Sequence, residues 1–243
     1  MKSWSNSDED EVPTPVISLE ILYETDDLIA INKPHGLLVH RSRMAADVQE
    51  FALQILRDQI GQPVWPVHRL DRKTSGVLLF SKRKEVNSII QTIFQERQIK
   101  KTYKALVRGH MDEKGTIDYA LSHESAPKEA VTHYTLVENF EINLVTTKFP
   151  TSRYSLIHVE PETGRFHQIR KHLHHISHPI LGDRPHGCNK QNRIWLAKFG
   201  LEKMLLHAES LEFEYPAGNK VRIEAGMSAE FLRVLDIMRL EKS

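Results

Sequence analysis

Residues 68–82 read HRLDRKTSGVLLFSK and join a charged segment to an apolar one. The apolar residues 77–80 predict a buried strand, and the Thr-Ser-Gly tripeptide before them is typical of a turn. Asp71 would therefore lie on a loop that enters a rigid strand, a usual place for a functional residue. Arg69 and Arg72 favour the ionised form of its carboxyl group, which can act as a nucleophile or a base.

Asp71 by itself does not establish a site, because an aspartate beside arginine is most often a surface ion pair or a turn cap. The stretch 68–76 is more specific. Its HRLD, two spacer residues and TSG resemble the signature of the RluA-type pseudouridine synthases, whose aspartate at this place is catalytic. The resemblance implies that Asp71 is the catalytic residue and that Arg69 fills the position that a flipped base leaves in the RNA.

Two other segments extend the resemblance. Residues 32–36, NKPHG, match the N-terminal signature of the family, and Tyr103 stands in a Lys-x-Tyr context. A tyrosine in a strand is usually half-buried packing. In the family this tyrosine lies against the target base, which implies that Tyr103 stacks on uracil and offers a hydroxyl for proton exchange.

A second dense motif, TGRFHQIRKH, covers residues 163–172. Apolar residues recur at helical spacing, so we expect a helix over 166–176 after a glycine turn. In the resembling family the arginine of the HQIR sequence pairs with the catalytic aspartate, which implies that Arg170 holds Asp71 ionised and aimed. The further residues that we expect to bind RNA or to flip the base are Arg69, His68, Arg72, Arg165, His167 and Gln168.

The net charge of +1 hides an uneven distribution. Residues 1–11 carry one lysine against four acids, which leaves +4 on the remaining chain. Residues 163–182 contain no acid, but they include two arginines, one lysine and five histidines. This segment can meet phosphates, so RNA is the expected partner, and no obligate protein partner is implied.

We expect neither a metal nor a cofactor. His172 and His175 have a helical spacing that can bind metal, but no HExxH sequence, clustered acid or thiol partner accompanies them. The single cysteine, Cys188, excludes a disulfide within the chain and a zinc site with two thiolates. There is no phosphate-binding loop or dinucleotide fingerprint, and the resemblance implies a cofactor-free isomerase.

The composition is that of an ordinary globular protein, with 40% hydrophobic and 27% charged residues. No apolar run approaches the roughly 20 residues of a membrane span, and the N-terminus has no secretory signal. We therefore expect a cytoplasmic protein that does not contact a membrane.

The patterning predicts one α/β (α+β) domain over residues 18–243, after a flexible acidic tail, residues 1–17, with no catalytic role. The resemblance implies the pseudouridine synthase fold, a mixed, mostly antiparallel sheet with flanking helices and a central catalytic cleft. Some relatives place a small S4 domain in front, and as a departure from them we expect no S4 domain here. The expected strands are 21–23, 28–31, 77–80, 100–109, 116–121, 131–137, 153–159 and 205–215, and the expected helices are 45–60, 85–95, 166–176 and 229–239.

Several polar segments are relevant to how the protein contacts RNA and to which RNA it modifies. Loops 122–129 and 139–152 are candidates for RNA contact, although solvated loops are an equal interpretation. Residues 57–61, residues 150–154 and the polar loop 186–193 resemble the branch of the family that modifies tRNA, with its target at position 65 in the stem of the TΨC arm.

The resemblance implies conversion of a uridine within RNA into pseudouridine. Asp71 would attack the ribose at C1′ or remove the 2′-proton to give a glycal, and both routes stay open. Three alternatives also stay open: a ribosomal RNA enzyme with the same motif, a hydrolase, and a non-catalytic RNA-binding protein. A hydrolase would want a second carboxylate near Asp71, where the motif supplies basic neighbours.

Overall fold

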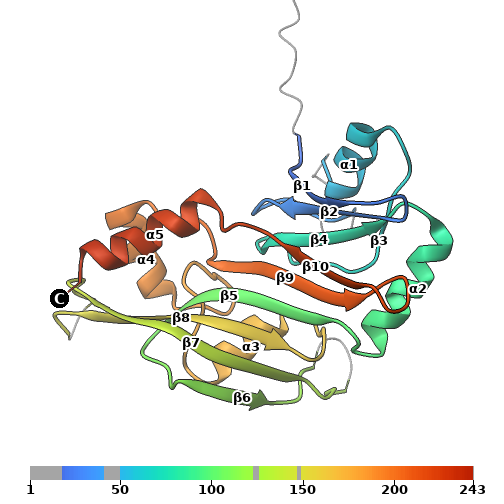
Figure 1. Cartoon of the computed structure of the whole chain (residues 1–243). Coiled ribbons are helices and arrows are strands. Elements are labelled where there is room, and N and C mark those ends of the chain that lie inside the picture. Colours follow the sequence, from blue (N-terminus) through green and yellow to red (C-terminus); the bar gives the residue numbers. More distant parts are fainter. Residues whose placement is uncertain (1–17, 41–49, 123–125, 147–148, 243) are drawn as a thin grey trace, which may run out of the picture.

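The computed structural model describes residues 18–40, 50–122, 126–146 and 149–242, and one ten-stranded sheet organises them (Figure 1). The strands are β1 (Ile21–Glu24), β2 (Leu28–Lys33), β3 (Trp65–Pro66), β4 (Ser75–Ser81), β5 (Lys100–Arg108), β6 (Lys114–Asp118), β7 (Val131–Ile142), β8 (Ser152–Pro161), β9 (Leu206–Glu214) and β10 (Lys220–Glu224). The helices are α1 (Ala52–Ile60), α2 (Lys84–Gln95), α3 (Gln168–His175), α4 (Asn189–Phe199) and α5 (Ala229–Leu240). The mixed, mostly antiparallel sheet with flanking helices confirms the expected fold class.

The sheet follows the order β1-β2-β4-β9-β5-β8-β7-β6, with β3 beside β4 and β10 beside β9. The paired strands run antiparallel except for β4 and β9, which pair in parallel through a short register of Ser75 with His207 and Gly76 with Ala208. Gly76 has φ of 108°, and a Cβ there would lie 2.1 Å from the carbonyl oxygen of Ala208. The glycine of the TSG sequence therefore permits the close approach that joins the two halves of the sheet.

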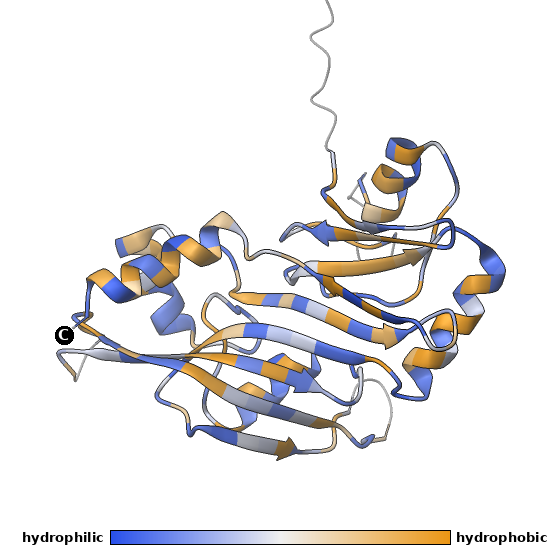
Figure 2. Ribbon diagram, in the orientation of Figure 1, coloured by the Kyte–Doolittle hydropathy of each residue, from blue (hydrophilic) through white to orange (hydrophobic). Residues whose placement is uncertain are grey.

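The half of the sheet that contains β4 is covered on both faces. Leu78 and Phe80 pack on one face with α1, and Val77 and Leu79 pack on the other with α2. All seven residues of β4 are buried, and Figure 2 shows the strand largely in hydrophobic colours. A strand with apolar neighbours on both faces needs a continuous apolar run, which explains the sequence of residues 77–80.

The other half of the sheet is also covered on both faces. Ile157 and Val159 of β8 pack with Ile169 and Leu173 of α3, whereas the opposite face of β5 and β8 packs with α4 and α5. Figure 1 shows α3 on one side of this half and α4 with α5 on the other. This packing holds α3, the helix that carries part of the second motif, against the sheet.

Three sequence expectations differ from the structure. Residues 189–193, expected within a polar loop, form the first part of α4, whose buried residues are only Gln191 and Trp195, so its sequence lacks a clear apolar stripe. Strand β7 extends to Ile142, and the side chain of Asn139 accepts a hydrogen bond from the Ser155 hydroxyl instead of standing in a loop. Residues 50 and 51, expected within the first helix, lie outside it, because α1 begins at Ala52.

Residues 1–17 and 41–49 lie outside the described residues, and with them the acidic tail and the first part of the first expected helix. Within the described ranges, no helix is both long and apolar enough to cross a membrane.

Candidate active site

A cavity of about 580 Å³ lies where the two halves of the sheet meet. Its walls come from the loop before β4, from β5 and from the segment that leads into α3. The predicted site residues that line it are His68, Arg69, Asp71, Tyr103, Arg165, His167, Gln168 and Arg170. Arg72 is not among the lining residues, so the fold brings together all of the predicted residues but this one.

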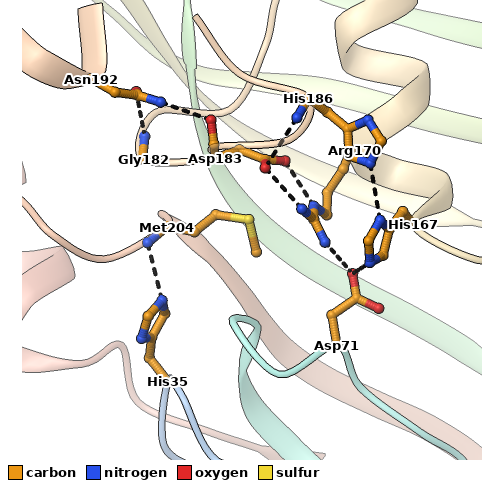
Figure 3. A network of polar contacts seen from close by, with 9 residues as sticks. All are labelled: His35, Asp71, His167, Arg170, Gly182, Asp183, His186, Asn192 and Met204. Atoms are coloured by element: carbon orange, nitrogen blue, oxygen red, sulfur yellow. Dashed lines mark hydrogen bonds and ion pairs between the residues drawn. The ribbon is translucent and has the colours of Figure 1, made fainter. Parts of the chain in front are cut away.

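The carboxylate of Asp71 is held through one oxygen. Nη1 of Arg170 lies 3.0 Å from Oδ2, and Nε2 of His167 lies 3.6 Å from the same atom (Figure 3). The side chain is 21% exposed and lines the cavity. Since both contacts within the described residues are made by Oδ2, the second oxygen, Oδ1, is the one free to react.

Arg170 also binds Asp183, which the sequence analysis did not select. Its Nε and Nη2 atoms lie 2.7 and 2.8 Å from the two carboxylate oxygens of Asp183, and both side chains are almost completely buried. Burial alone would lower the pKa of the guanidinium, but the hydrogen bonds and charges of Asp183 and Asp71 raise it above its ordinary value. Two carboxylates thus compensate one buried cation and fix its direction.

The loop that carries Asp183 is itself tightly built. Asn192 of α4 donates a hydrogen bond of 2.7 Å to the carbonyl oxygen of Asp183 and accepts one of 3.0 Å from the amide of Gly182. A Cβ on Gly187 would lie 1.8 Å from that same carbonyl oxygen, so this position needs glycine. Helix α4, which the polar sequence of residues 189–193 did not predict, therefore holds the loop of Asp183 in place.

His167 adopts a left-handed conformation, with φ of 55°, immediately before α3. Its ring stacks on Phe166, and its Nδ1 lies 2.9 Å from Nε2 of His186. Burial lowers the pKa of His167 to about 4, although the charge of Asp71 acts in the opposite direction. The ring is therefore neutral at pH 7. A non-glycine residue in this conformation costs about 1 kcal/mol or more and is often found at functional sites.

Tyr103 lies on β5 opposite Val159 and Ala208, and its half-buried ring faces the cavity. Burial and the negative charge of Asp71 raise the pKa of its hydroxyl above the ordinary value. The side chain therefore stays a protonated phenol at neutral pH. It can stack on a base and donate a hydrogen bond, but it is not a phenolate base.

Two predicted residues make structural hydrogen bonds in the cavity wall. Nε2 of His68 accepts a 3.0 Å hydrogen bond from the amide of Leu79, and burial lowers the pKa of the ring to about 3. The amide group of Gln168 accepts from Thr163 and donates to Val131. These contacts shape the cavity around Asp71 and occupy groups that were expected to meet RNA.

The predicted arginines have different surroundings. The side chain of Arg69 is exposed at the cavity and makes no hydrogen bond or ion pair with another described residue. Arg165 donates from Nε to the carbonyl oxygen of Glu129, and Arg72 donates from Nε to that of Gly36. Arg69 is therefore the most available of these cations for RNA.

Lys33, noted only as part of the NKPHG signature, supports the loop that carries Asp71. Its Nζ atom is buried and donates to the carbonyl oxygens of Pro34, Leu37 and Arg72, at 2.9, 2.9 and 3.2 Å. Burial lowers its pKa to about 7, against the effect of the Asp71 charge. The neighbouring His35 accepts a 3.2 Å hydrogen bond from the amide of Met204 (Figure 3). Lys33 thus ties β2 to the loop of Asp71, and His35 ties the segment after β2 to the segment before β9.

The described residues contain no group of three or more His, Cys, Asp or Glu side chains that could hold a metal ion. The polar groups that line the cavity are instead the carboxylates of Asp71 and Glu162, several arginines, a lysine, neutral imidazoles and a phenol, and Glu162 is paired with His133. Such a set can hold an anion, stack on a base and provide one nucleophile or base.

Comparison with known proteins identifies a family and several similar proteins. The sequence profile described as RNA pseudouridylate synthase matches residues 27–175. Proteins named tRNA pseudouridine synthase C are similar: that of Vibrio parahaemolyticus is 45% identical, with 84% of this chain and 88% of that protein covered. That of Pasteurella multocida is 44% identical, with 91% of this chain and 96% of that protein covered.

Solved structures share the fold. Human RNA Pseudouridylate Synthase Domain Containing 1 superposes with a TM-score of 0.71 at 23% identity, covering 93% of this chain and 97% of that chain. Human RNA Pseudouridylate Synthase Domain Containing 4 gives a TM-score of 0.69 at 26% identity, covering 90% and 93%.

Proposed function

The chain belongs to the RNA pseudouridylate synthase family, and from this premise we propose that it isomerises uridine 65 in the TΨC stem of tRNA to pseudouridine. The family makes it an isomerase that acts on uridine in RNA. The names of its 45% and 44% identical relatives favour tRNA as the substrate. Because tRNA is made and used in the cytoplasm, we expect the enzyme to act there.

The observation that carries the proposal is the one-sided binding of Asp71. Arg170 and His167 face Oδ2, so Oδ1 can approach the ribose of a uridine in the cavity. Attack by Oδ1 at C1′ would form an ester and release uracil, whereas removal of the 2′-proton would release uracil and form a glycal. Either route uses the same oxygen and needs the same support from Arg170.

The remaining steps conserve atoms and charge. The released uracil turns within the cavity, and its C5 forms the new bond to C1′ while Asp71 is regenerated. C5 then loses its proton and N1 gains one, so no outside reactant is consumed. Tyr103 provides the stacking face and a protonated hydroxyl for the turning base, because its raised pKa keeps the phenol intact.

The target uridine must leave its helix before Asp71 can reach the sugar. We assign Arg69 to the position that the base vacates, because this side chain is exposed at the cavity beside Asp71 and has no partner among the described residues. We expect Arg165, which also lines the cavity, to contact the RNA backbone.

The test is to incubate the protein with an unmodified tRNA transcript, with the same tRNA carrying cytidine at position 65, and with a ribosomal RNA fragment. Pseudouridine is mapped by carbodiimide-stop primer extension. We expect one stop, at position 65, that is lost with Asp71→Asn and kept with the matched variant Asp236→Asn, whose carboxylate is exposed on α5. Modification of the ribosomal fragment alone would overturn the tRNA assignment, and full activity of Asp71→Asn would overturn the site.

A further inference from the structure

His186 contacts the active site without lining the cavity. Its Nε2 lies 2.9 Å from Nδ1 of His167, and the two rings meet edge to face with their centres 5.1 Å apart. His167 in turn directs Nε2 at Asp71, at 3.6 Å (Figure 3). The rings of His186 and His167 therefore form a chain of contacts that ends at the carboxylate of Asp71.

Both rings are neutral at pH 7. Burial lowers the pKa of each, to about 4 for His167, while nearby charges of both signs act on them. Besides Asp71, the groups that face the pair are Asp183 from its loop and Arg170, Lys171 and His174 from α3. A neutral imidazole carries one proton, so the position of that proton decides which nitrogen donates.

The charge of Asp71 contributes to the position of the proton on His167. A distance of 3.6 Å exceeds a hydrogen bond, but a lone pair on Nε2 would face the negative charge of the carboxylate. The tautomer with the proton on Nε2 is therefore favoured, and Nδ1 becomes an acceptor. The proton between the two rings then belongs to Nε2 of His186.

His186 is held in place independently of any substrate. Its backbone amide lies 3.3 Å from Oδ1 of Asp183, and its loop is closed by the tight approach at Gly187 and by Asn192. The donor to His167 is thus fixed by the same loop that supplies the carboxylate for Arg170.

We propose that His186 is a positioning residue, which holds His167 in the tautomer that directs Nε2–H at Oδ2 of Asp71 and so keeps Oδ1 as the reacting oxygen. This inference rests on the proposed function for its effect on rate, but not for the tautomer itself. Without a donor at position 186, the proton of His167 can move to Nδ1, and the lone pair on Nε2 then repels Asp71.

The tautomer is measured first, with no RNA present. Long-range proton–nitrogen correlation spectra of the ring-labelled protein report which nitrogen of each histidine is protonated, and the His167 signal is identified by its loss in His167→Gln. We expect wild-type His167 to be protonated on Nε2. His186→Phe should produce a mixture of tautomers, and His186→Gln should restore the wild-type signal, because its amide nitrogen reaches about as far as Nε2.

Kinetics follow on the tRNA transcript. We expect His186→Phe to lower kcat about tenfold with KM changed less than about twofold, and His186→Gln to stay within about twofold of wild type. His110→Phe is the matched control, since His110 is exposed and bonds to the carbonyl oxygen of Phe140 at another place on the sheet. His186→Leu provides a smaller replacement if the phenylalanine variant does not fold.

Two results would overturn the inference: a wild-type His167 protonated on Nδ1, or a His186→Gln variant as slow as His186→Phe. The second result would indicate that His186 transfers a proton, which glutamine cannot do. A wild-type protein that forms no pseudouridine would contradict the proposed function instead, and the tautomer measurement would keep its meaning.

Discussion

Arg170 joins Asp71 to Asp183 through separate atoms of one guanidinium group. Nη1 lies 3.0 Å from Asp71, and Nε and Nη2 lie 2.7 and 2.8 Å from Asp183. The buried carboxylate of Asp183 fixes the plane of the guanidinium, and this plane sets the direction from which Asp71 is held. The side chain of Arg170 therefore aligns the loop that carries Asp71 with the loop that carries Asp183.

Replacing Arg170 by lysine should separate charge from geometry. One ammonium nitrogen cannot reproduce the fork that reaches both carboxylates, so Asp71 would keep a nearby cation but lose its fixed direction. We expect kcat to fall by about 100-fold, with tRNA affinity within about threefold of wild type. Single-turnover rates and filter binding measure the two quantities. Equal losses of rate and affinity would argue against the positioning role.

Asp183→Asn should destabilise the protein as well as slow it. The variant removes one of two charges that compensate a buried guanidinium, and breaking a buried ion pair from one side costs about 3 kcal/mol. Urea unfolding should show a loss of this size, and the exposed Asp112→Asn should show almost none. An unfolding free energy that stays at the wild-type value would mean that Asp71 alone compensates Arg170.

Arg69 and Arg72 flank Asp71 in the sequence but should differ in function. Arg69 is exposed at the cavity, whereas Arg72 lies outside its lining and bonds to Gly36. We expect Arg69→Ala to lower kcat/KM on folded tRNA by about 100-fold, because base flipping loses its replacement group. Arg72→Ala should cost less than about fivefold. The two variants are compared at one salt concentration, and equal losses would rule out a special role for Arg69.

The contribution of Lys33 to stability should depend on pH. Burial lowers its pKa to about 7, so at pH 7 to 10 the unfolded chain binds this proton more tightly than the folded protein. Stability linked to Lys33 therefore increases as pH rises through this window, by up to about 1.4 kcal/mol per pH unit. The unfolding free energy of the wild type minus that of Lys33→Met should therefore increase as pH rises from 7 to 10.

The control for Lys33 is Lys114→Met, at an exposed position of β6, for which the difference should stay flat. Urea unfolding at pH 7, 8, 9 and 10 measures both series. A difference that stays constant for Lys33→Met would show that its three carbonyl acceptors keep the ammonium charged throughout.

Much of the fold was predictable because its patterns are local. The alternating contacts of β4 require an uninterrupted apolar run, and the helix capped by Ser228 was expected close to where α5 is found. Helix α4 was not predicted, since it buries only Gln191 and Trp195. Its place is determined by contacts with distant segments, such as the hydrogen bonds from Asn192 to the loop of Asp183.

The sequence by itself determined the chemical groups of the site: one carboxylate among basic residues, a tyrosine, and a helix that carries Arg170. The residue pattern did not decide which arginine binds Asp71: the family resemblance implied Arg170, and only the tertiary structure brings its guanidinium to the carboxylate, at 3.0 Å. Within the described part of the chain, the neighbouring Arg69 and Arg72 make no ion pair with it, whereas Arg170, 99 residues away, does. Residues adjacent along a loop point in different directions, so contact with a fixed carboxylate depends on how the sheet and α3 pack.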